Sequence, residues 1–261
     1  MKPLIYTSAF LLFAIFSFTK CTPPTQLIEQ PSEYLYLRFE NQKDGINSSA
    51  VAFHLGFKTY YTVIAGNKAF PLEVFNSNGD FILSTEAEVD CRGLWYNPKT
   101  KCLETNSTDG IIYCIHLGDD GLPTGDTEVI VDNPELKKHN TCANFDSKNN
   151  FLLYYSNGQI FKYKRDKENF VKIHDLNLPC EAYKINKTNF IYTGYKEFEI
   201  GLLNCEDREV YFFNLKTGET THTIKLPDTL KVNCEYRFDF VNDFMFFYDL
   251  ETRMWTGLKI F

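Results

Sequence analysis

One pattern of strands and turns recurs along the chain and restricts its fold more than any other feature. The clearest copy spans Arg208 to Leu226, where two strand-like runs flank a Lys-Thr-Gly turn. Gly218 stands in that turn where a positive φ is expected. Further units start near residues 49, 91, 142, 180 and 234, about 40 to 55 residues apart. This period, with short strands and no helical stretch, predicts an all-β propeller rather than a sandwich.

The units predict about five four-stranded blades. The 54 residues from Cys180 to Asn233 leave room for a sixth. The last unit begins at Cys234 and holds only three strand-like segments, whereas one spare segment, Tyr34 to Glu40, precedes the first unit. Pairing the two would close the ring and remove two exposed sheet edges. We therefore expect the N-terminal strand to complete the last blade.

The sequence of these units also resembles a known group of propellers. The run REVYFFNLKTGETTHTIKL, preceded by EIGLLNCED, is similar to a blade of the YVTN, quinoprotein-like and NHL group, as is FPLEVFNSNGDFILS. Over residues 34–261 the chain resembles the propeller domains of uncharacterised bacterial surface lipoproteins. The resemblance implies a propeller but no particular activity, because the group includes both enzymes and binding modules.

The N-terminal residues predict export. Lys2 precedes a mainly apolar run from Leu4 to Phe18, which is shorter than a membrane span and typical of a signal peptide. Cys21 follows at once, and this order resembles a bacterial lipoprotein signal, which implies that Cys21 is lipidated. Lys20 and Phe18 depart from the small residue and the Leu that are usual there.

The predicted organisation is therefore an export signal at residues 1–20, an anchoring cysteine and tether at 21–33, and a propeller at 34–261. The lipid would hold the domain to a bacterial membrane, at the outer membrane, facing the periplasm or the cell surface. A retained N-terminal membrane anchor and a secreted protein are the alternatives.

Composition bears on the partners. The chain has 27 basic and 34 acidic residues, a formal charge of −7, which is a poor match for the phosphate backbone of nucleic acids. The aromatic content of 16% favours β structure. We expect a protein or carbohydrate partner, no nucleic acid, and membrane contact through the lipid anchor only.

Two of the eight cysteines, Cys102 and Cys114, flank a turn at Asn106 to Gly110. A five-residue hairpin loop would place them opposite each other within bridging range, and a four-residue loop would place them on opposite faces. A disulfide between Cys102 and Cys114 is therefore one of the two outcomes that the sequence allows, and export permits it without requiring it.

Four other cysteines each stand just before an inner strand: Cys91, Cys142, Cys180 and Cys234. We interpret them as small buried residues at equivalent positions. The alternative is a ring of thiols at one mouth of the channel, able to bind a soft metal.

The sequence contains none of the GxGxxG, Walker, HExxH or GxSxG motifs, so no catalytic residue is assigned. Some propeller hydrolases and lactonases hold a metal in the channel with acids and Asn, and the equivalent positions here are Asp90, Asn140, Glu181 and Glu235. Their oxygen atoms would suit Ca²⁺. The alternative is that they line a hydrated channel mouth.

These observations favour a non-catalytic binding or scaffolding module, since loops on a rigid scaffold carry recognition. One alternative is a divalent-metal-dependent channel enzyme such as a lactonase, lyase or glycoside-active enzyme. Another is a secreted soluble glycoprotein, because acceptor sequons begin at Asn47, Asn106 and Asn186. A channel plugged by Phe and Tyr would favour the binding module, and convergent carboxylates with room for a ligand would favour the enzyme.

Overall fold

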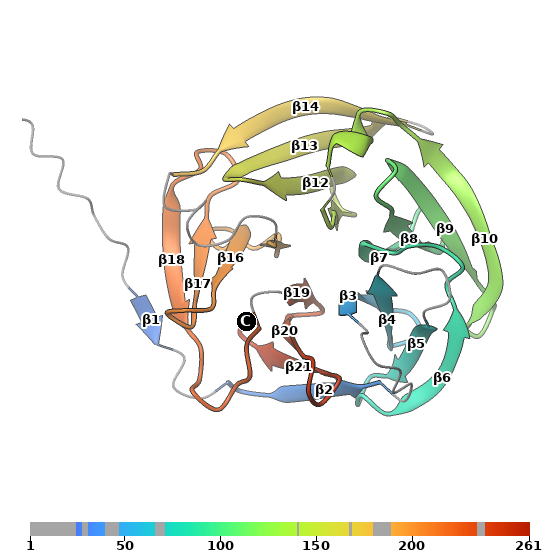
Figure 1. Ribbon diagram of the computed structural model, residues 1–261, viewed down its shortest axis with the longest axis horizontal. Helices are drawn as coiled ribbons and strands as arrows, with labels where there is room; N and C mark the ends of the chain where they lie inside the picture. The colour runs from blue at the N-terminus through green and yellow to red at the C-terminus, as the bar shows by residue number, and fades with distance from the viewer. Residues whose placement is uncertain are drawn as a thin grey trace, which may run out of the picture.

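A computed structural model describes residues 25–27, 31–39, 47–65, 71–139, 141–166, 169–179, 189–233 and 238–261. In these residues the chain forms five sheets arranged as a ring (Figure 1). Each sheet contains a four-stranded antiparallel blade that runs from an inner strand beside the central axis to an outer strand at the rim, and one sheet has a fifth, parallel strand at its edge. The predicted all-β propeller is confirmed, and the ring has five blades rather than six.

The first three blades follow the order of the chain, each from its inner to its outer strand. Blade 1 contains β3 (Asn47–His54), β4 (Thr59–Ala65), β5 (Pro71–Asn76) and β6 (Phe81–Glu86). Blade 2 contains β7 (Gly93–Asn97), β8 (Cys102–Asn106), β9 (Ile111–Leu117) and β10 (Pro123–Asp132). After a short 3₁₀ helix, η1 (Leu136–Lys138), blade 3 contains β11 (Asn144–Asp146), β12 (Phe151–Ser156), β13 (Gln159–Asp166) and β14 (Asn169–Asn177).

The last two blades recruit strands from the N-terminal part of the chain. Blade 4 contains β15 (Ile191–Tyr192), β16 (Ile200–Asn204), β17 (Glu209–Phe213) and β18 (Thr220–Lys225), with β1 (Thr25–Leu27) added at its edge. Blade 5 contains β19 (Phe238–Val241), β20 (Phe244–Asp249), β21 (Met254–Lys259) and β2 (Tyr34–Arg38).

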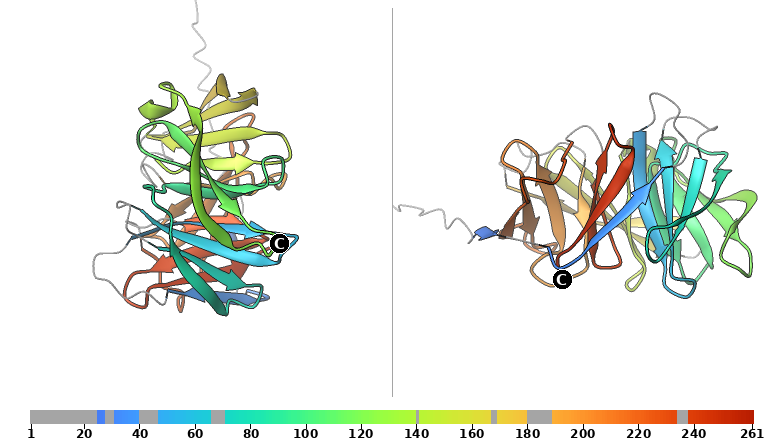
Figure 2. Two further views of the ribbon diagram at one scale, coloured as in Figure 1. Left: turned by 90° about the vertical axis from the view of Figure 1, so that its right-hand side faces the viewer. Right: turned by 90° about the horizontal axis from the view of Figure 1, so that it is seen from below.

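Strand β2 closes the ring. It pairs antiparallel with β21, from Tyr34 opposite Leu258 to Arg38 opposite Met254, and the two strands lie side by side in Figure 2. Leu35 and Leu37 are buried, whereas Tyr34, Tyr36 and Arg38, which alternate with them, are exposed, as the period-two pattern requires. The predicted completion of the last blade by the N-terminal strand is confirmed.

Strand β1 is an addition that the sequence pattern did not indicate. Thr25–Leu27 lies in the segment predicted as a tether, and it pairs in parallel with β18, with Thr25 opposite Thr223. Because β18 is the outer strand of its blade, its outward backbone groups offer an edge to which another strand can pair.

The hairpin of β17 and β18 contains the turn recognised in the sequence. Gly218 has a φ of +75°, and a Cβ there would meet the carbonyl oxygen of Asn177 at 2.8 Å. The first strand ends at Phe213, before the Lys-Thr-Gly turn begins. Asn214 is the reason, because its side-chain oxygen accepts the backbone N–H groups of the next turn and bends the chain there.

The hydrophobic core consists of five clusters, one at each seam between neighbouring blades. The cluster between blades 5 and 1, for example, joins Leu37 and Trp255 to Tyr60. Every blade therefore takes part in two clusters, and the closed ring leaves no blade with an uncovered face. Among the described residues, no helix is long and apolar enough to cross a membrane.

Candidate functional site

The central channel is lined by the inner strands of all five blades. A cavity of about 190 Å³ lies within it, which we call the throat. One aromatic residue from the end of each inner strand contributes to its lining, and we call this set the aromatic collar: Phe53, Tyr96, Phe145, Tyr192 and Phe240. Each stands at the last residue of its strand or one residue before it.

Packing at the seams holds the collar in place. Each of the five residues is half-buried and packs against a different one of the five core clusters. Phe145 also stacks on Trp95, with ring centroids 5.6 Å apart and planes inclined by 27°. The collar therefore sits at the channel end of the five seams, and none of its five residues is fully buried.

Beyond the collar a wider cavity of about 390 Å³ opens, which we call the mouth. It shares Phe145, Tyr192 and Phe240 with the throat, so the two spaces adjoin each other. Its lining adds polar residues from the turns after β11 and β19, among them Lys148 and Asn242. The mouth therefore lies at the C-terminal ends of the inner strands, where loops can meet a ligand.

One carboxylate at the mouth orients a collar ring. Asp146 accepts hydrogen bonds from the Tyr192 hydroxyl and from the Asn149 side chain, both at 2.8 Å. Burial, reinforced by the Asp146 carboxylate, raises the pKa of Tyr192 above its usual range. The Tyr192 hydroxyl therefore stays protonated and remains a donor to Asp146.

A second carboxylate, in the throat, joins blade 5 to blade 1. Asp239 on β19 accepts the backbone N–H of Val51 and that of Phe240, both at 2.9 Å. Its side chain is 5% exposed. Asn144 on β11 bridges in the same way to blade 4, accepting from the Tyr192 N–H at 3.4 Å. These polar groups set the relative positions of the strands that carry the collar.

Of the four predicted calcium ligands, only Asp90 lies in the described residues. Asp90 forms an ion pair with Arg92 at 2.8 Å and lines neither the throat nor the mouth. Asn140, Glu181 and Glu235 lie outside the described residues, as does the predicted lipidation site Cys21. The calcium site and the lipid anchor stay predictions.

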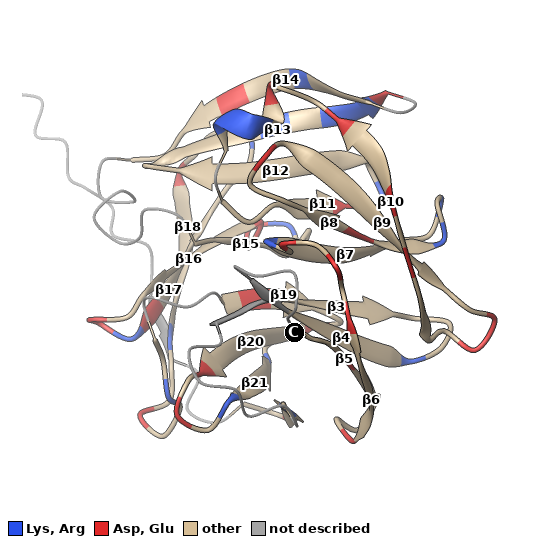
Figure 3. Cartoon of the chain, turned by 45° about the vertical axis from the view of Figure 1, so that its right-hand side comes forward, with Lys and Arg blue, Asp and Glu red and all other residues tan. Residues whose placement is uncertain are grey.

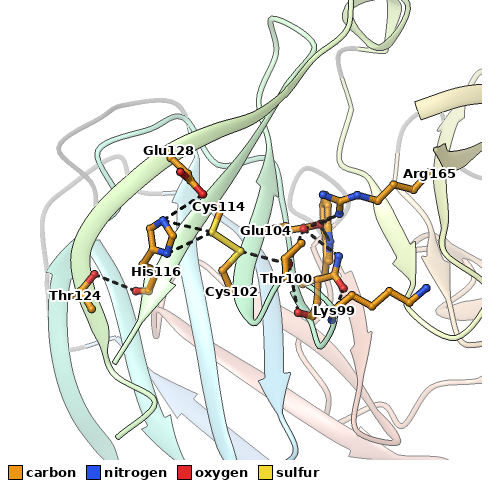
Figure 4. Close-up of a disulfide and its surroundings, with 11 residues drawn as sticks. Lys99, Thr100, Cys102, Glu104, Cys114, His116, Thr124, Glu128 and Arg165 are labelled. Atoms are coloured by element: carbon orange, nitrogen blue, oxygen red, sulfur yellow. Dashed lines mark hydrogen bonds and ion pairs between the residues drawn. A yellow bond between two sulfur atoms is a disulfide. The ribbon is translucent and has the colours of Figure 1, made fainter. Parts of the chain in front are cut away.

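The structure joins Cys102 and Cys114 in a disulfide between β8 and β9, with Cα atoms 5.7 Å apart (Figure 4). The hairpin register differs from both loop geometries considered from the sequence, since Cys114 pairs with Glu104. Cys102 is thus displaced by two residues from direct opposition. A shift of two keeps both side chains on one face, so the sulfur atoms still meet.

Of the cysteines that precede inner strands, Cys91 and Cys142 are thiols, while Cys180 and Cys234 lie outside the described residues. Cys91 is fully buried, and its thiol donates to the Val89 carbonyl oxygen at 3.5 Å. Burial raises the pKa of Cys91 to about 12, so the thiolate that a soft metal needs is disfavoured. Cys91 fits the interpretation as a small buried residue.

Two ionisable side chains stand beside the disulfide on the outer part of blade 2. His116 Nδ1 lies 3.8 Å from Cys114 Sγ, and His116 Nε2 lies 3.4 Å from a Glu128 oxygen (Figure 4). These groups are close enough to share a metal ion. With the sulfur committed to a disulfide, only an imidazole and a carboxylate remain as ligands, fewer than a closed zinc site uses.

A buried ion pair crosses the seam between blades 2 and 3. Arg165 on β13 contacts both oxygens of Glu104 on β8, at 2.6 and 2.8 Å (Figure 4). Three further donors of blade 2 complete the shell of Glu104, each at 2.9 Å: Trp95 Nε1, Asn97 Nδ2 and Thr100 Oγ1. The Glu104 side chain is completely buried and that of Arg165 is 9% exposed.

The sequence interpretation identified neither the collar nor the Glu104–Arg165 pair. The collar could have been recognised in the sequence, because an aromatic residue stands near the end of the inner strand in every unit. The sequence offered no indication of the ion pair, since Glu104 and Arg165 are 61 residues apart and occupy different strands of their blades.

No family model and no curated protein sequence matches the chain. Among solved structures, it is similar to the Myceliophteria thermophila Cps50 (Swd1) β-propeller domain, with a TM-score of 0.51, 9% identity and coverage of 86% of this chain and 85% of that one. The Myxococcus xanthus glutaminyl cyclase gives a TM-score of 0.50 at 9% identity, covering 88% and 97%. A nidogen/laminin complex gives 0.48 at 11%, covering 79% and 73%. At these identities the first two likenesses concern the fold alone, and with the five-blade ring they make this chain a β-propeller.

Proposed function

We propose that this protein is an exported binding module, held to a bacterial membrane by a lipid on Cys21, which takes its ligand at the mouth of the propeller channel. It would belong to the YVTN, quinoprotein-like and NHL type of propeller that its blades resemble. The single observation that carries the binding role is the aromatic collar, to which all five blades contribute.

A collar of this kind suits recognition. Ligand sites are concave, lined mainly by apolar and aromatic side chains, and hold a few placed polar groups. The throat and mouth fit this description, with Asp146 and Asn242 among the polar groups of the mouth. Exposed hydrophobic side chains stand in the turns at the same end of the inner strands, including Leu55 (77% exposed) and Tyr195 (40%). Such residues favour contact with a partner that covers the mouth.

The two carboxylates of the channel act as parts of the scaffold. Asp146 orients Tyr192, and Asp239 ties β19 to β3. Both are engaged in holding collar residues, which supports a binding role for the channel over a chemical one.

The membrane anchor rests on the sequence alone, and mass spectrometry of the mature N-terminus tests it. We expect a first residue Cys21 carrying acyl chains, and we expect Cys21→Ala to move the protein from the membrane to the soluble fraction. Cleavage at another position, or an unmodified Cys21, would exclude the anchor without bearing on the channel.

Arrays of defined glycans and peptides test the binding role. Full-length protein in detergent is compared with a Phe145→Ala/Phe240→Ala double variant. Tyr36→Ala is the matched control, because Tyr36 is 49% exposed on β2, at the outer rim. We expect ligands that bind the unaltered protein and the Tyr36 variant but not the collar variant. If every array ligand binds the collar variant equally well, the channel is not the binding site.

A further inference from the structure

We propose that the aromatic collar is a cage for a quaternary ammonium head group. This inference rests on the proposed binding role of the channel mouth and names the chemical class of its ligand. The shared chemistry is a trimethylammonium group, which can come from a small molecule such as choline or from a methylated lysine side chain.

The first argument is the number of rings around one small space. Five blades each supply one ring to the throat, and Trp95 adds a sixth aromatic side chain behind Phe145. The face of an aromatic ring carries negative electrostatic potential and attracts a cation, more strongly where water is excluded. A ring of half-buried aromatic side chains therefore offers a cation several such faces at once.

The second argument is the charge of the lining. Among the described residues that line the throat, Asp239 carries the one formal charge, and it is negative. The mouth adds Asp146 and Lys148. The other described basic side chains of blade 3 lie on β13 and β14, and Lys137 and Lys138 lie on η1 just before it, all at the outer part of the ring (Figure 3). With a chain charge of −7, this distribution favours a cation over an anion in the throat.

The third argument separates a quaternary ammonium from a primary one. A lysine-type ammonium needs acceptors for three N–H groups. The two acceptor side chains that tie the inner strands together are already engaged, since Asp239 accepts from Val51 and Phe240, and Asn144 accepts from Tyr192. A quaternary ammonium has no N–H groups, so methyl contacts with the rings satisfy it completely.

Size agrees with a compact head group and an extended tail. The throat of about 190 Å³ is smaller than the roughly 300–1,000 Å³ usual for drug-sized ligands. The mouth of about 390 Å³ adjoins it at Phe145 and Tyr192. A trimethylammonium group in the throat would therefore leave its tail in the mouth, beside the polar turn residues.

The experiment compares choline with its neutral isostere 3,3-dimethylbutanol. Both are titrated into full-length protein in detergent, and binding is followed by isothermal titration calorimetry and by saturation-transfer NMR of the methyl protons. We expect choline to bind about tenfold more tightly, because only choline carries the charge that the ring faces attract. A peptide carrying trimethyllysine, run beside the same peptide with unmodified lysine, identifies the source of the head group.

Variants assign the effect to the collar. Phe145→Leu keeps an apolar side chain but removes a ring face, so we expect choline binding to weaken about fivefold while 3,3-dimethylbutanol is affected less. Tyr36→Leu at the outer rim is the matched control and should leave both affinities unchanged. Circular dichroism verifies that each variant is folded.

The outcomes separate this inference from the proposed function. Equal affinity for choline and its isostere, with loss of both in the Phe145→Leu variant, would overturn the cation cage and leave a binding mouth. Binding of the array ligands at the collar without any binding of choline or trimethyllysine would do the same. Choline binding that Phe145→Leu does not weaken would place the cation elsewhere and also overturn the proposal.

Discussion

The seam between blades 2 and 3 and the collar at its channel end are built from neighbouring side chains but differ in what they leave uncovered. In the seam, Glu104 is 0% exposed and its carboxylate is surrounded by donors, including Arg165 from the next blade. In the collar, Phe145 is only half-buried and one side of its ring stacks on Trp95. In the seam, the buried charged groups are paired with each other and with hydrogen-bond donors, which stabilises the ring of blades. The collar, in contrast, retains surface for a ligand.

The largest expected effect comes from breaking the ion pair of the seam. Arg165→Ala leaves the Glu104 carboxylate buried without its cation, which we expect to lower the free energy of unfolding by about 3–5 kcal/mol. Chemical denaturation followed by circular dichroism measures it. Lys164→Ala is the control, because Lys164 is exposed on the same strand and should change stability by less than about 0.5 kcal/mol.

A second variant tests whether the stability lost in Arg165→Ala comes from the uncompensated Glu104 charge. Glu104→Gln combined with Arg165→Met removes both charges and keeps an acceptor for the blade 2 donors, and we expect it to recover a large part of the stability lost in Arg165→Ala. A double variant as unstable as the single one would show that packing around Arg165, rather than an uncompensated charge, is what the seam requires.

A smaller effect is expected from pH at the same seam. His139 follows η1, stacks on Tyr154 at 4.8 Å and has its Nε2 2.6 Å from the Tyr163 hydroxyl. Burial, with a minor contribution from the nearby Lys172, lowers the pKa of His139 to about 4. The unfolded chain, with a His pKa of about 6.5, then binds the proton more readily between pH 6.5 and 4.

Stability should therefore be complete above pH 6.5 and fall as the pH is lowered towards 4, by on the order of 2 kcal/mol from this residue. Urea unfolding at a series of pH values measures the slope. The His139→Gln variant should lose this component of the slope, whereas His174→Gln, an exposed residue on β14, should keep it. An unchanged slope in the His139 variant would assign the pH dependence to other groups.

The smallest effect on stability is expected in the collar. Phe145→Ala removes the stacking on Trp95 and should cost about 1 kcal/mol. Leu152 is the matched comparison, because it pairs with Phe145 across β11 and β12 but is fully buried in the seam cluster. Leu152→Ala should cost about 2–5 kcal/mol, measured by the same denaturation. Equal costs would mean that the collar is core rather than site.

The strands and their order could be predicted because their signals are local. The turn at Gly218 and the alternation of buried Leu35 and Leu37 with exposed residues depend only on residues close in the sequence. Counting the repeated strand units therefore revealed that blade 5 lacked one strand. The disulfide was predictable for the same reason, since Cys102 and Cys114 flank one hairpin. Its register was not, because a change of two residues in the hairpin pairing leaves the facing pattern unchanged.

The channel and the seams depend on how blades pack, which a strand pattern does not encode. Asp90 precedes an inner strand, as expected of a channel ligand, and its carboxylate pairs with Arg92, two residues along the chain. Strand β1 pairs with β18 because β18 has an unpaired outer edge, and no pattern in residues 22–32 indicates this pairing.

Periodicity and turn chemistry in the sequence alone thus determined that this protein is a closed β-propeller whose last blade borrows an N-terminal strand. Tertiary structure decided the rest. Glu104 and Arg165 meet although they are 61 residues apart. The collar forms because five strand ends separated by whole blades converge on one axis. Local forces act between near neighbours in the chain, whereas burial and pairing act between whatever residues the closed ring brings together.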